Sequence, residues 1–574
     1  MLILILLALL GMTPASEPEL SLDAQMGSTF ATIDVEISLD SYGHPAIYYL
    51  ALESGSVEPD VDMILAYAAG YQSDGLESGT AVRGHWIASS TYDKRNFALS
   101  GGENIENTPR EEGFVDGICY DIYMIAIDAG GLISSVASAK NIMAMPFDSI
   151  EENVYIITQA KHMMNIDYFP DADYLLAADL DLRNWKRIKS FSGNLNGGGY
   201  TIKNLRQELF ETLDKAIVQN LCIEGARVFS CGIMARSALN STIVDCTVSG
   251  TVVYTDTGSA GGVVGYASGS AFKGCEAYVD VKGKSCVGGF AGSLANESML
   301  VNCRSYGDVY GEKIVGGFVG TTEGVKLSEN ANHSIKLVQC HSFGDVELVR
   351  GVAVVPVDGI AGGFAGVATD GIAGGFAGDL SYTVADAVSA SGEVMANNAV
   401  VGGFVGRLTH RSRITNACAY GDVNNVSGKQ TGGFVGLITH GSGIEYAFSS
   451  GDVSGSQDTG GFAGAISSLG APNTLFACLS FANWVLSDGN GSGLNRLIGR
   501  MDHEGVNNCY AYLGSMVTSG GDTLLHVSPN AYGVDGGDIN NQTIEGILSR
   551  LGWDQRYWSF EWASDILRKP KLIQ

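Results

Sequence analysis

A short glycine-rich repeat constrains the fold of this 574-residue chain more than any other feature. The pentad Gly-Gly-φ-x-Gly, where φ is apolar, occurs eight times, with its first glycine at 261, 288, 316, 362, 374, 402, 432 and 460. Most copies are about 28 residues apart, and periods of 20–50 residues are typical of solenoids and propellers. The nonapeptide Asp-Gly-Ile-Ala-Gly-Gly-Phe-Ala-Gly occurs at 358–366 and again at 370–378, which predicts one coil out of step.

A second signature, Val301-Asn-Cys-Arg-Ser-Tyr-Gly-Asp-Val309, follows the pentad in most units. Its alternate residues are small or apolar, which indicates short strands with one buried face. No helical period accompanies them. If each strand pairs with the same strand one unit later, the result is a parallel sheet with ~4.8 Å between rungs. We therefore predict an all-β fold, a right-handed parallel β-helix, in which like side chains stack.

Two such ladders are expected inside the helix. The first consists of small or thiol residues, namely Cys246, Cys275, Cys303, Cys340, Ala417, Ala447, Cys478 and Cys509. The second consists of Phe290, Phe318, Phe364, Phe376, Phe404, Phe434 and Phe462. Neighbouring rungs are close enough for disulfides. Because alanine replaces cysteine at two rungs, we favour buried, reduced thiols.

The sequence divides the chain into four segments. Residues 1–16 have the short apolar run of a signal peptide, too short to span a bilayer. Residues 17–147 contain alternating strands without the repeat, as in a small β-sandwich. Residues 148–518 form the β-helix, and residues 519–574 close it. We expect a secreted or cell-surface protein with no further membrane span.

The net charge makes one class of binding partner improbable. The chain has 34 basic and 62 acidic residues, a net charge of −28, so nucleic acid would be repelled over most of its surface. The 11 cysteines show no CxxC pair and no zinc-type spacing with histidine. No cofactor or metal site is predicted.

The repeat also resembles a known family. The unit Gly-Gly-Phe-Val-Gly followed by Asn-Cys-x-x-Tyr-Gly-Asp-Val is similar to the GLUG repeat of bacterial, adhesin-like surface proteins. The segment that leads into the repeats and the ending from Leu551 to Leu572 are similar to the flanks of such repeats. Residues 27–145 resemble fibronectin type III-like modules. The resemblance implies an extracellular β-helix and leaves the ligand open.

The sequence contains only weak candidates for catalytic motifs. GLUG repeats occur beside some IgA-cleaving metallopeptidases, but the zinc motif His-Glu-x-x-His is absent; the nearest string begins at His503. The acids that recur once per unit, Asp308, Asp345, Asp422 and Asp452, are better explained as turn or edge residues than as a catalytic pair. The same holds for Asp179 and Asp181, for which Ca²⁺ binding is the alternative.

Two other sets of residues are candidates for binding. His410 and His440 both follow a Gly-Gly-Phe-Val-Gly pentad and should stack, either as a two-histidine metal site or as a plain consequence of the repeat. An aromatic column precedes the signature glycine position, at Tyr278, Tyr306, Phe343, Tyr420, Phe481 and Tyr512. If these rings face outward, they form a binding stripe; if the chain turns there, they form a buried corner stack.

The sequence therefore predicts a non-catalytic, adhesin-like or scaffold protein that presents its β-helix to a glycan or a surface protein. A carbohydrate-active β-helix enzyme and a purely structural spacer are the alternatives. Acids clustered in a groove with shifted pKa values would favour the enzyme.

Overall fold

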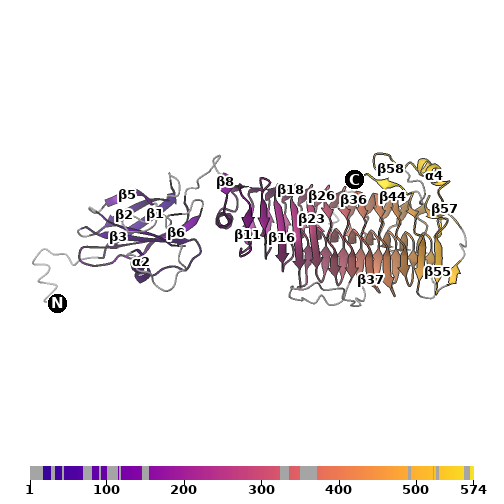
Figure 1. The fold of residues 1–574 in the computed structure, drawn as a ribbon, viewed down its shortest axis with the longest axis horizontal. Coiled ribbons are helices and arrows are strands. Elements are labelled where there is room, and N and C mark those ends of the chain that lie inside the picture. The colour runs from indigo at the N-terminus through magenta and orange to yellow at the C-terminus, as the bar shows by residue number, and fades with distance from the viewer. Residues whose placement is uncertain are drawn as a thin grey trace, which may run out of the picture. The chain divides into compact units, whose positions relative to one another are not determined.

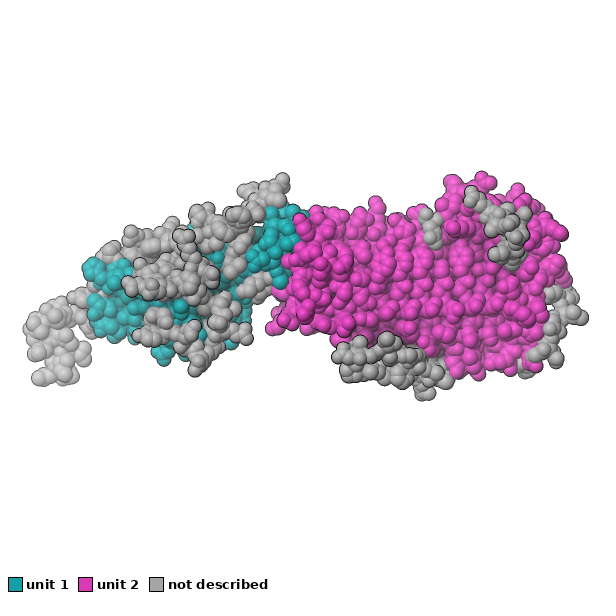
Figure 2. Space-filling model, in the orientation of Figure 1, with its two compact units in different colours: residues 1–178 teal, residues 179–574 magenta. Residues whose placement is uncertain are grey.

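The computed structural model describes residues 17–27, 33–41, 44–68, 81–88, 92–99, 114, 118–144, 154–323, 335–348, 371–488, 493–520, 522–524, 529–560 and 569–573. The chain divides into two compact units, residues 1–178 and 179–574, coloured teal and magenta in Figure 2. The predicted signal peptide, residues 1–16, lies outside the described residues.

The first unit contains an antiparallel sandwich. One sheet has the order β1 (Glu19–Met26), β2 (Ile33–Asp40) and β5 (Tyr92–Leu99). The other has the order β4 (Ala81–Ile87), β3 (Ala46–Glu53), β6 (Cys119–Ile127) and β7 (Ala137–Met143). Strand β2 buries every second residue, and these side chains form one core with the inward residues of β3 and β6.

Helical segments complete this unit. Helix α2 (Val61–Ala68) packs Ile64 and Tyr67 on the opposite face of β3 and β6. Strands β8 (Val154–Ile157) and β9 (Asp173–Leu176) pair in parallel, and η2 (Ala160–Met164) and α3 (Asn165–Tyr168) connect them.

The second unit is a parallel β-helix, which confirms the predicted fold class (Figure 1). Its strands pair with the corresponding strands of the next coil and form long rows. One row consists of β11 (Ile188–Phe191), β14 (Phe210–Asp214), β17 (Ala235–Leu239), β21 (Val264–Ser268), β25 (Ala291–Ala295), β30 (Val319–Glu323), β35 (Ala377–Ser381), β39 (Val405–Thr409), β43 (Val435–Ile438), β47 (Ala463–Ile466) and β52 (Ile498–Met501). A second consists of β20 (Ser259–Gly261), β24 (Cys286–Gly288), β29 (Ile314–Gly316), β34 (Ile372–Gly374), β38 (Val400–Gly402), β42 (Gln430–Gly432), β46 (Thr459–Gly460) and β51 (Leu494–Asn495).

The remaining strands form three rows that share several long strands. The first of these contains β12 (Asn194–Asn196), β15 (Ile217–Gln219), β18 (Thr242–Val244), β22 (Ala271–Lys273), β26 (Met299–Val301), β31 (Ile335–Val338), β36 (Thr383–Ala390), β40 (Arg413–Ala419), β44 (Gly443–Ser449), β48 (Thr474–Phe476) and β53 (Val506–Asn507). The next contains β10 (Leu180–Asp181), β13 (Thr201–Lys203), β16 (Cys222–Val228), β19 (Thr247–Val253), β23 (Glu276–Lys282), β27 (Arg304–Ser305), β32 (His341–Ser342), β49 (Leu479–Ser480), β54 (Tyr510–Tyr512) and β57 (Gly537–Ile539). The last contains β28 (Val309–Gly311), β33 (Val346–Leu348), β37 (Val394–Asn397), β41 (Val423–Val426), β45 (Val453–Gly455), β50 (Trp484–Ser487) and β55 (Met516–Ser519), and β55 forms a hairpin with β56 (Asp522–Leu524).

The phenylalanine of the pentad forms a continuous internal stack. Successive ring centroids from Phe290 to Phe462 lie 4.7–5.0 Å apart and are nearly parallel. The glycines beside them allow the coils to approach, since a Cβ on Gly403 would lie 2.2 Å from the carbonyl oxygen of Gly433. In this stack Phe318 packs directly on Phe376. Phe364 and the first nonapeptide copy lie outside the described residues.

The small-residue ladder is buried along its length. Val388 occupies the rung between Cys340 and Ala417, because Val388 pairs with Ala417 in register. All eleven cysteines are free thiols in the structure. The thiols of the ladder donate to backbone carbonyls, as Cys275 does to Lys273 at 3.4 Å and to Ile243 at 3.6 Å. Burial holds the pKa of the Cys303 thiol well above its usual value.

The C-terminal segment covers the last coils. Helix α4 (Ile544–Leu551) ends at Gly552 in a left-handed conformation, and β58 (Trp558–Ser559) pairs antiparallel with β59 (Lys571–Leu572). Their apolar side chains form one cluster with Phe448 and Phe481 of the β-helix. Figure 1 shows α4 and β58 beside the C-terminal coils.

Candidate binding surface

Three of the six predicted aromatic residues form one stack on the outside of the β-helix. Strand register places Tyr278 beside Tyr306 and Tyr306 beside Phe343. The residue before each ring is fully buried, so each ring lies on the opposite, outer face of its strand. Ring centroids lie 4.3 Å apart between the two tyrosines and 4.8 Å apart between Tyr306 and Phe343, with angles of 1° and 8°. Tyr278 is 44% exposed, and the other two rings are half-buried.

A small residue occupies the rung at each end of this stack. Ser249 pairs with Tyr278 in register, and Ser391 follows Phe343 because Ser342 pairs with Ala390. A serine one rung away does not cover a six-membered ring. No ring of the column therefore continues the stack beyond Tyr278 or beyond Phe343.

Charged groups fix the exposed tyrosine. The hydroxyl of Tyr278 donates to Glu276 at 2.9 Å, and Arg304 contacts the other oxygen of Glu276 at 3.2 Å. The hydrogen bond to Glu276 raises the pKa of Tyr278, and partial burial of the ring contributes less to the same shift. The tyrosine therefore stays a neutral hydrogen-bond donor, held in one orientation.

The repeated acids flank the stack and have a structural contact of their own. The carboxylate of Asp280 accepts the backbone N–H of Asp308 at 3.0 Å, and Asp308 accepts that of Asp345 at 2.9 Å. Asp345 continues the ladder to the N–H of Glu393 at 2.8 Å, and Asp422 does the same for Asp452 at 2.7 Å. Each carboxylate thus links two coils through one oxygen. In Asp308 the other oxygen accepts from the hydroxyl of Tyr310 at 3.5 Å.

The other three aromatic residues lie apart from this stack. The register places Ser391 before Tyr420 and Ser450 between Tyr420 and Phe481, so the column is interrupted twice. Phe481 is fully buried, and Tyr420 packs against the cluster formed by the C-terminal segment. Burial raises the pKa of Tyr420. Tyr512 is half-buried, and its carbonyl accepts from Arg496 at 3.5 Å.

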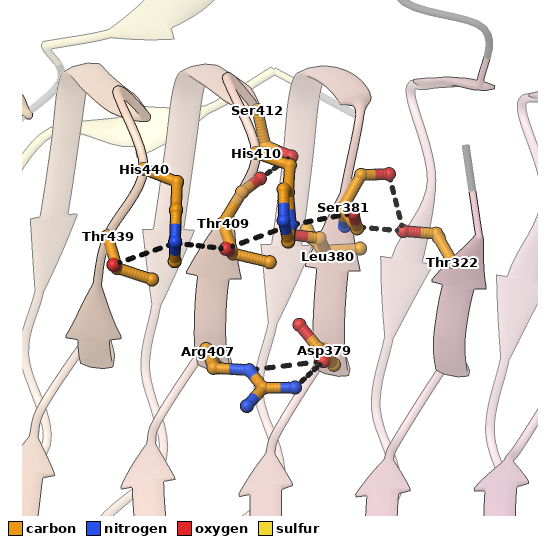
Figure 3. Close-up of polar contacts among 10 residues, drawn as sticks. All are labelled: Thr322, Asp379, Leu380, Ser381, Arg407, Thr409, His410, Ser412, Thr439 and His440. Carbon is orange, nitrogen blue, oxygen red and sulfur yellow. Dashed lines mark hydrogen bonds and ion pairs between the residues drawn. The ribbon is translucent and has the colours of Figure 1, made fainter. Parts of the chain in front are cut away.

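The two histidines stack, as their spacing predicts. Their ring centroids lie 4.8 Å apart at an angle of 9°, and Tyr382 stacks on His410 at 5.2 Å. Figure 3 shows the hydroxyl of Thr409 between the two imidazoles, 3.1 Å from Nδ1 of His410 and 3.2 Å from Nδ1 of His440. Burial and then the neighbouring His440 lower the pKa of His410.

This histidine column belongs to a run of hydroxyl groups. Ser381 lies 3.2 Å from Nδ1 of His410, and its backbone N–H donates to Thr322 at 2.8 Å. Below them in Figure 3, Arg407 forms an ion pair with Asp379 on the neighbouring strand. Across the described residues, no three histidine, cysteine or acidic side chains are grouped to hold a metal ion. Both imidazoles contact hydroxyl groups of this column.

The acids of the first coil are also engaged. Asp179 accepts the backbone N–H of Thr201 and contacts Lys203 at 2.9 Å. Asp181 contacts Arg183 at 3.3 Å and accepts from the amide of Asn204 at 2.9 Å. The hydrogen bond from Lys203 lowers the pKa of Asp179, and the backbone N–H of Arg183, 3.0 Å from Asp181, lowers the pKa of Asp181. Ionised, paired carboxylates of this kind are poor general acids.

The pKa of one carboxyl group, that of Glu347, is shifted in the opposite direction. Glu347 pairs in register with Tyr310, and burial raises its pKa. Lys282 lies over the ring of Tyr310, 5.0 Å from its centroid, and opposes the shift at Glu347. Sequence analysis missed this group because only the register brings the three residues together.

Comparisons with known proteins show likeness at the level of solved structures only. No protein-family model and no curated protein matches the chain. The crystal structure of a "putative immunoglobulin A1 protease from Bacteroides ovatus" matches 71% of this chain and 89% of its own length, at 14% identity and a TM-score of 0.29. A structure of "IgA1 Protease" matches 83% of this chain and 31% of its own length, at 15% identity and a TM-score of 0.32. Pectate lyase PelI from Erwinia chrysanthemi in complex with tetragalacturonic acid matches 91% of this chain at 8% identity and a TM-score of 0.12. Likeness at these values assigns no activity or ligand to this chain.

Proposed function

We propose that this chain is a secreted or cell-surface, non-catalytic scaffold of the adhesin type, whose β-helix binds glycans through Tyr278, Tyr306 and Phe343. The observation that carries the proposal is the outward three-ring stack with a serine rung at each end. Sugar rings pack their C–H faces on aromatic rings, and the uncovered face of Tyr278 offers such a platform. The flanking carboxylate of Asp280 accepts the backbone N–H of Asp308 through one oxygen and offers the other to a sugar hydroxyl.

The stack favours a glycan over a protein partner. Protein hot spots are well-packed apolar pockets surrounded by contacts that exclude water. Here the rings lie beside one row of carboxylates, Asp280, Asp308 and Asp345, and the hydroxyl of Tyr278 donates to Glu276 on the protein surface. A hydroxylated, flat-faced ligand fits this combination better than an apolar side chain.

The proposal also includes the export of this chain and its resemblance to surface proteins with GLUG-type repeats. No helix in the described part of the chain is long and apolar enough to cross a membrane. We propose that residues 1–16 direct export and that the 28-residue units are GLUG-type repeats of a surface protein. We also propose a fibronectin type III-like module at residues 17–147, which its two antiparallel sheets of three and four strands support.

A carbohydrate-active enzyme is the second candidate. The observation in its favour is Glu347, which pairs in register with Tyr310 and whose pKa is raised by burial. A raised pKa is what a catalytic general acid needs. Glycosidases pair such an acid with a second carboxylate. The neighbouring rung after Glu347 is Met395, and the repeated acids are held in coil-to-coil hydrogen bonds. We therefore place binding ahead of catalysis.

A glycan array tests the proposal. The purified protein is compared with a Tyr278→Ala/Tyr306→Ala variant and with Tyr532→Ala, which removes a 58% exposed tyrosine elsewhere. At roughly 0.5–1.5 kcal/mol per ring, loss of two rings should weaken binding by about tenfold or more. Tyr532→Ala should bind like the wild type. An array without hits, or hits that the double variant retains, would refute the proposal. Release of products from a bound glycan that stops in Glu347→Gln would establish the enzyme instead.

A further inference from the structure

A shallow pocket of about 420 Å³ opens on the outer surface of the first coils, close to the aromatic stack. Three arginines line it, Arg183, Arg206 and Arg227, together with the amide of Asn204. Its volume lies in the range of pockets that hold small molecules. The pocket is separate from the ring stack, and nothing in the repeat pattern predicts it.

A β-bulge creates the hollow. Along β16 and β19, Ile223 pairs with Val248, but the next pair is Ala226 with Gly250, so β16 contains one extra residue. Gly225 in the bulge has a φ of 64°, which favours glycine. A Cβ on Gly250 would lie 2.0 Å from the carbonyl oxygen of Ala226, so only glycine allows this approach. Both glycines line the pocket and expose backbone there.

The arginines come from consecutive coils. Backbone hydrogen bonds join Leu182 to Lys203, Asn204 to Glu224 and Arg227 to Leu205. Adjacent coils are ~4.8 Å apart, which brings the guanidinium groups close to one another. Arg183 forms an ion pair with Asp181. Within the described residues, Arg206 and Arg227 are exposed and have no acidic partner.

The surrounding coils are basic in an otherwise acidic protein. Residues 179–236 contain nine lysines and arginines and six acids, whereas the whole chain has a net charge of −28. The local acids have other partners. Glu208 is buried between Arg187 and Arg236 at 3.1 and 3.3 Å, and Glu224 lies in register with Lys203. Arg206 and Arg227 thus bring positive charge without an acidic partner among the described residues to the pocket.

The pocket adjoins the aromatic stack through one residue. Gly250 and Thr251 of the pocket follow Ser249, which is the serine rung beside Tyr278. The hydroxyl of Ser249 also accepts the backbone N–H of Gly225 at 3.4 Å. Arg206 and Tyr278 are three coils apart, about 14 Å along the helix axis. A single oligosaccharide can span that distance.

We infer that the arginine pocket binds the oxyanion of an acidic glycan, a carboxylate or a sulfate ester, while the neighbouring sugar stacks on Tyr278. This inference rests on the proposed glycan binding and names the class of glycan. Arginine forks match carboxylate and sulfate oxygens with paired hydrogen bonds, and the exposed backbone of the bulge admits the ligand closely. Nucleic acid is disfavoured because the basic patch is small and the rest of the surface repels a polyanion.

Binding titrations with three hexasaccharides test the inference, one sulfated, one built of uronates and one neutral. The wild type is compared with Arg206→Gln/Arg227→Gln and with Lys336→Gln/Arg556→Gln, which removes two charges elsewhere. We expect at least one acidic probe to bind more tightly than the neutral probe. The pocket variant should lose about tenfold of that affinity or more and keep its affinity for the neutral probe. The control variant should match the wild type, and comparison of the two acidic probes distinguishes carboxylate from sulfate.

Other outcomes separate this inference from the proposed function. Equal binding of neutral and acidic probes, unchanged in the pocket variant, would overturn the inference and leave glycan binding by the rings intact. Acidic-probe binding that survives Tyr278→Ala/Tyr306→Ala but not the pocket variant would support the pocket and refute the ring platform. If none of the three probes binds, or if single-stranded DNA is bound through Arg206 and Arg227 in their place, the inference is wrong.

Discussion

The buried His341 should make the stability of the β-helix depend on pH. The imidazole is 1% exposed, and its Nδ1 lies 2.8 Å from the hydroxyl of Ser389 on the next coil. Burial, and secondarily the positive charge of Arg304, lower its pKa from 6.5 to about 4. The folded state therefore holds the neutral imidazole, whereas the unfolded chain binds a proton near pH 6.5.

The magnitude follows from linkage. Because the folded pKa is the lower one, the contribution is fully present above pH 6.5 and is lost as the pH falls toward 4. Between pH 7.5 and pH 5, a shift from 6.5 to about 4 corresponds to about 2 kcal/mol of unfolding free energy. A neutral substitute, His341→Gln, removes this dependence.

Urea unfolding at the two pH values measures the effect. We expect the wild type to lose about 2 kcal/mol more than His341→Gln on acidification. Ser389→Ala is the matched control, since it removes the hydrogen-bond partner at a cost of about 1 kcal/mol but keeps the titrating ring. That control should retain the pH dependence. If His341→Gln and the wild type lose the same free energy, the assigned environment of His341 is wrong.

Urea unfolding also checks three predictions about packing. Phe404→Ala should lower the free energy of unfolding by about 3–5 kcal/mol, because it leaves a gap in the buried ring stack. Val426→Ala, at an exposed rung, should lower it by less than about 0.5 kcal/mol. Equal effects would show that the ring stack is not part of the core. Gly421→Ala should lower the free energy of unfolding by more than about 4 kcal/mol, since the new Cβ would lie 1.9 Å from a backbone oxygen of the preceding coil. In Gly546→Ala, on α4, the new Cβ meets no atom, so this variant should be more stable by about 0.5–1 kcal/mol. Arg496→Met should cost about 3–5 kcal/mol because two aspartates, 2.7 and 2.8 Å away, lose their buried partner; a neutral result would place these carboxylates in solvent.

The repeat predicted the β-helix because the main contacts of each unit are made with the equivalent residues of the neighbouring coil. A pentad with fixed glycines and an apolar third residue packs well against its own copies in neighbouring coils, and the ring ladder from Phe290 to Phe462 follows. The same argument predicted the stacking of His410 on His440. The predicted rung at Phe364 falls outside the described residues, and Phe318 stacks on Phe376 directly.

The candidate site could be predicted only in part. Six aromatic residues share one position of the repeat, but Ser391 and Ser450 occupy that position on two intervening coils. The C-terminal segment then covers the coils that carry Tyr420 and Phe481, and no property of the repeat indicates where that segment packs. Reading every rung, serines included, would have isolated the three-ring stack.

The arginine pocket escaped prediction for a different reason. Arg183, Arg206 and Arg227 are 23 and 21 residues apart, a shorter spacing than the 28-residue unit, and they lie before the first pentad. Only the register of β16 and β19, with its one-residue bulge, places them around one hollow. A local excess of basic residues in an acidic chain was the available signal.

Glycan binding on Tyr278 is tested most directly by a variant that covers the face of this ring without removing any ring. Ser249→Phe should extend the stack by one rung, because residue 249 pairs with Tyr278 in register, and it should occupy the surface on which we place the sugar. Affinity for a glycan bound by the wild type is measured for this variant and for Ser249→Ala, which leaves the ring uncovered. We expect Ser249→Phe to lose binding by about tenfold or more and Ser249→Ala to retain it. Full binding by a correctly folded Ser249→Phe would contradict the claim that the open face of Tyr278 is the glycan platform.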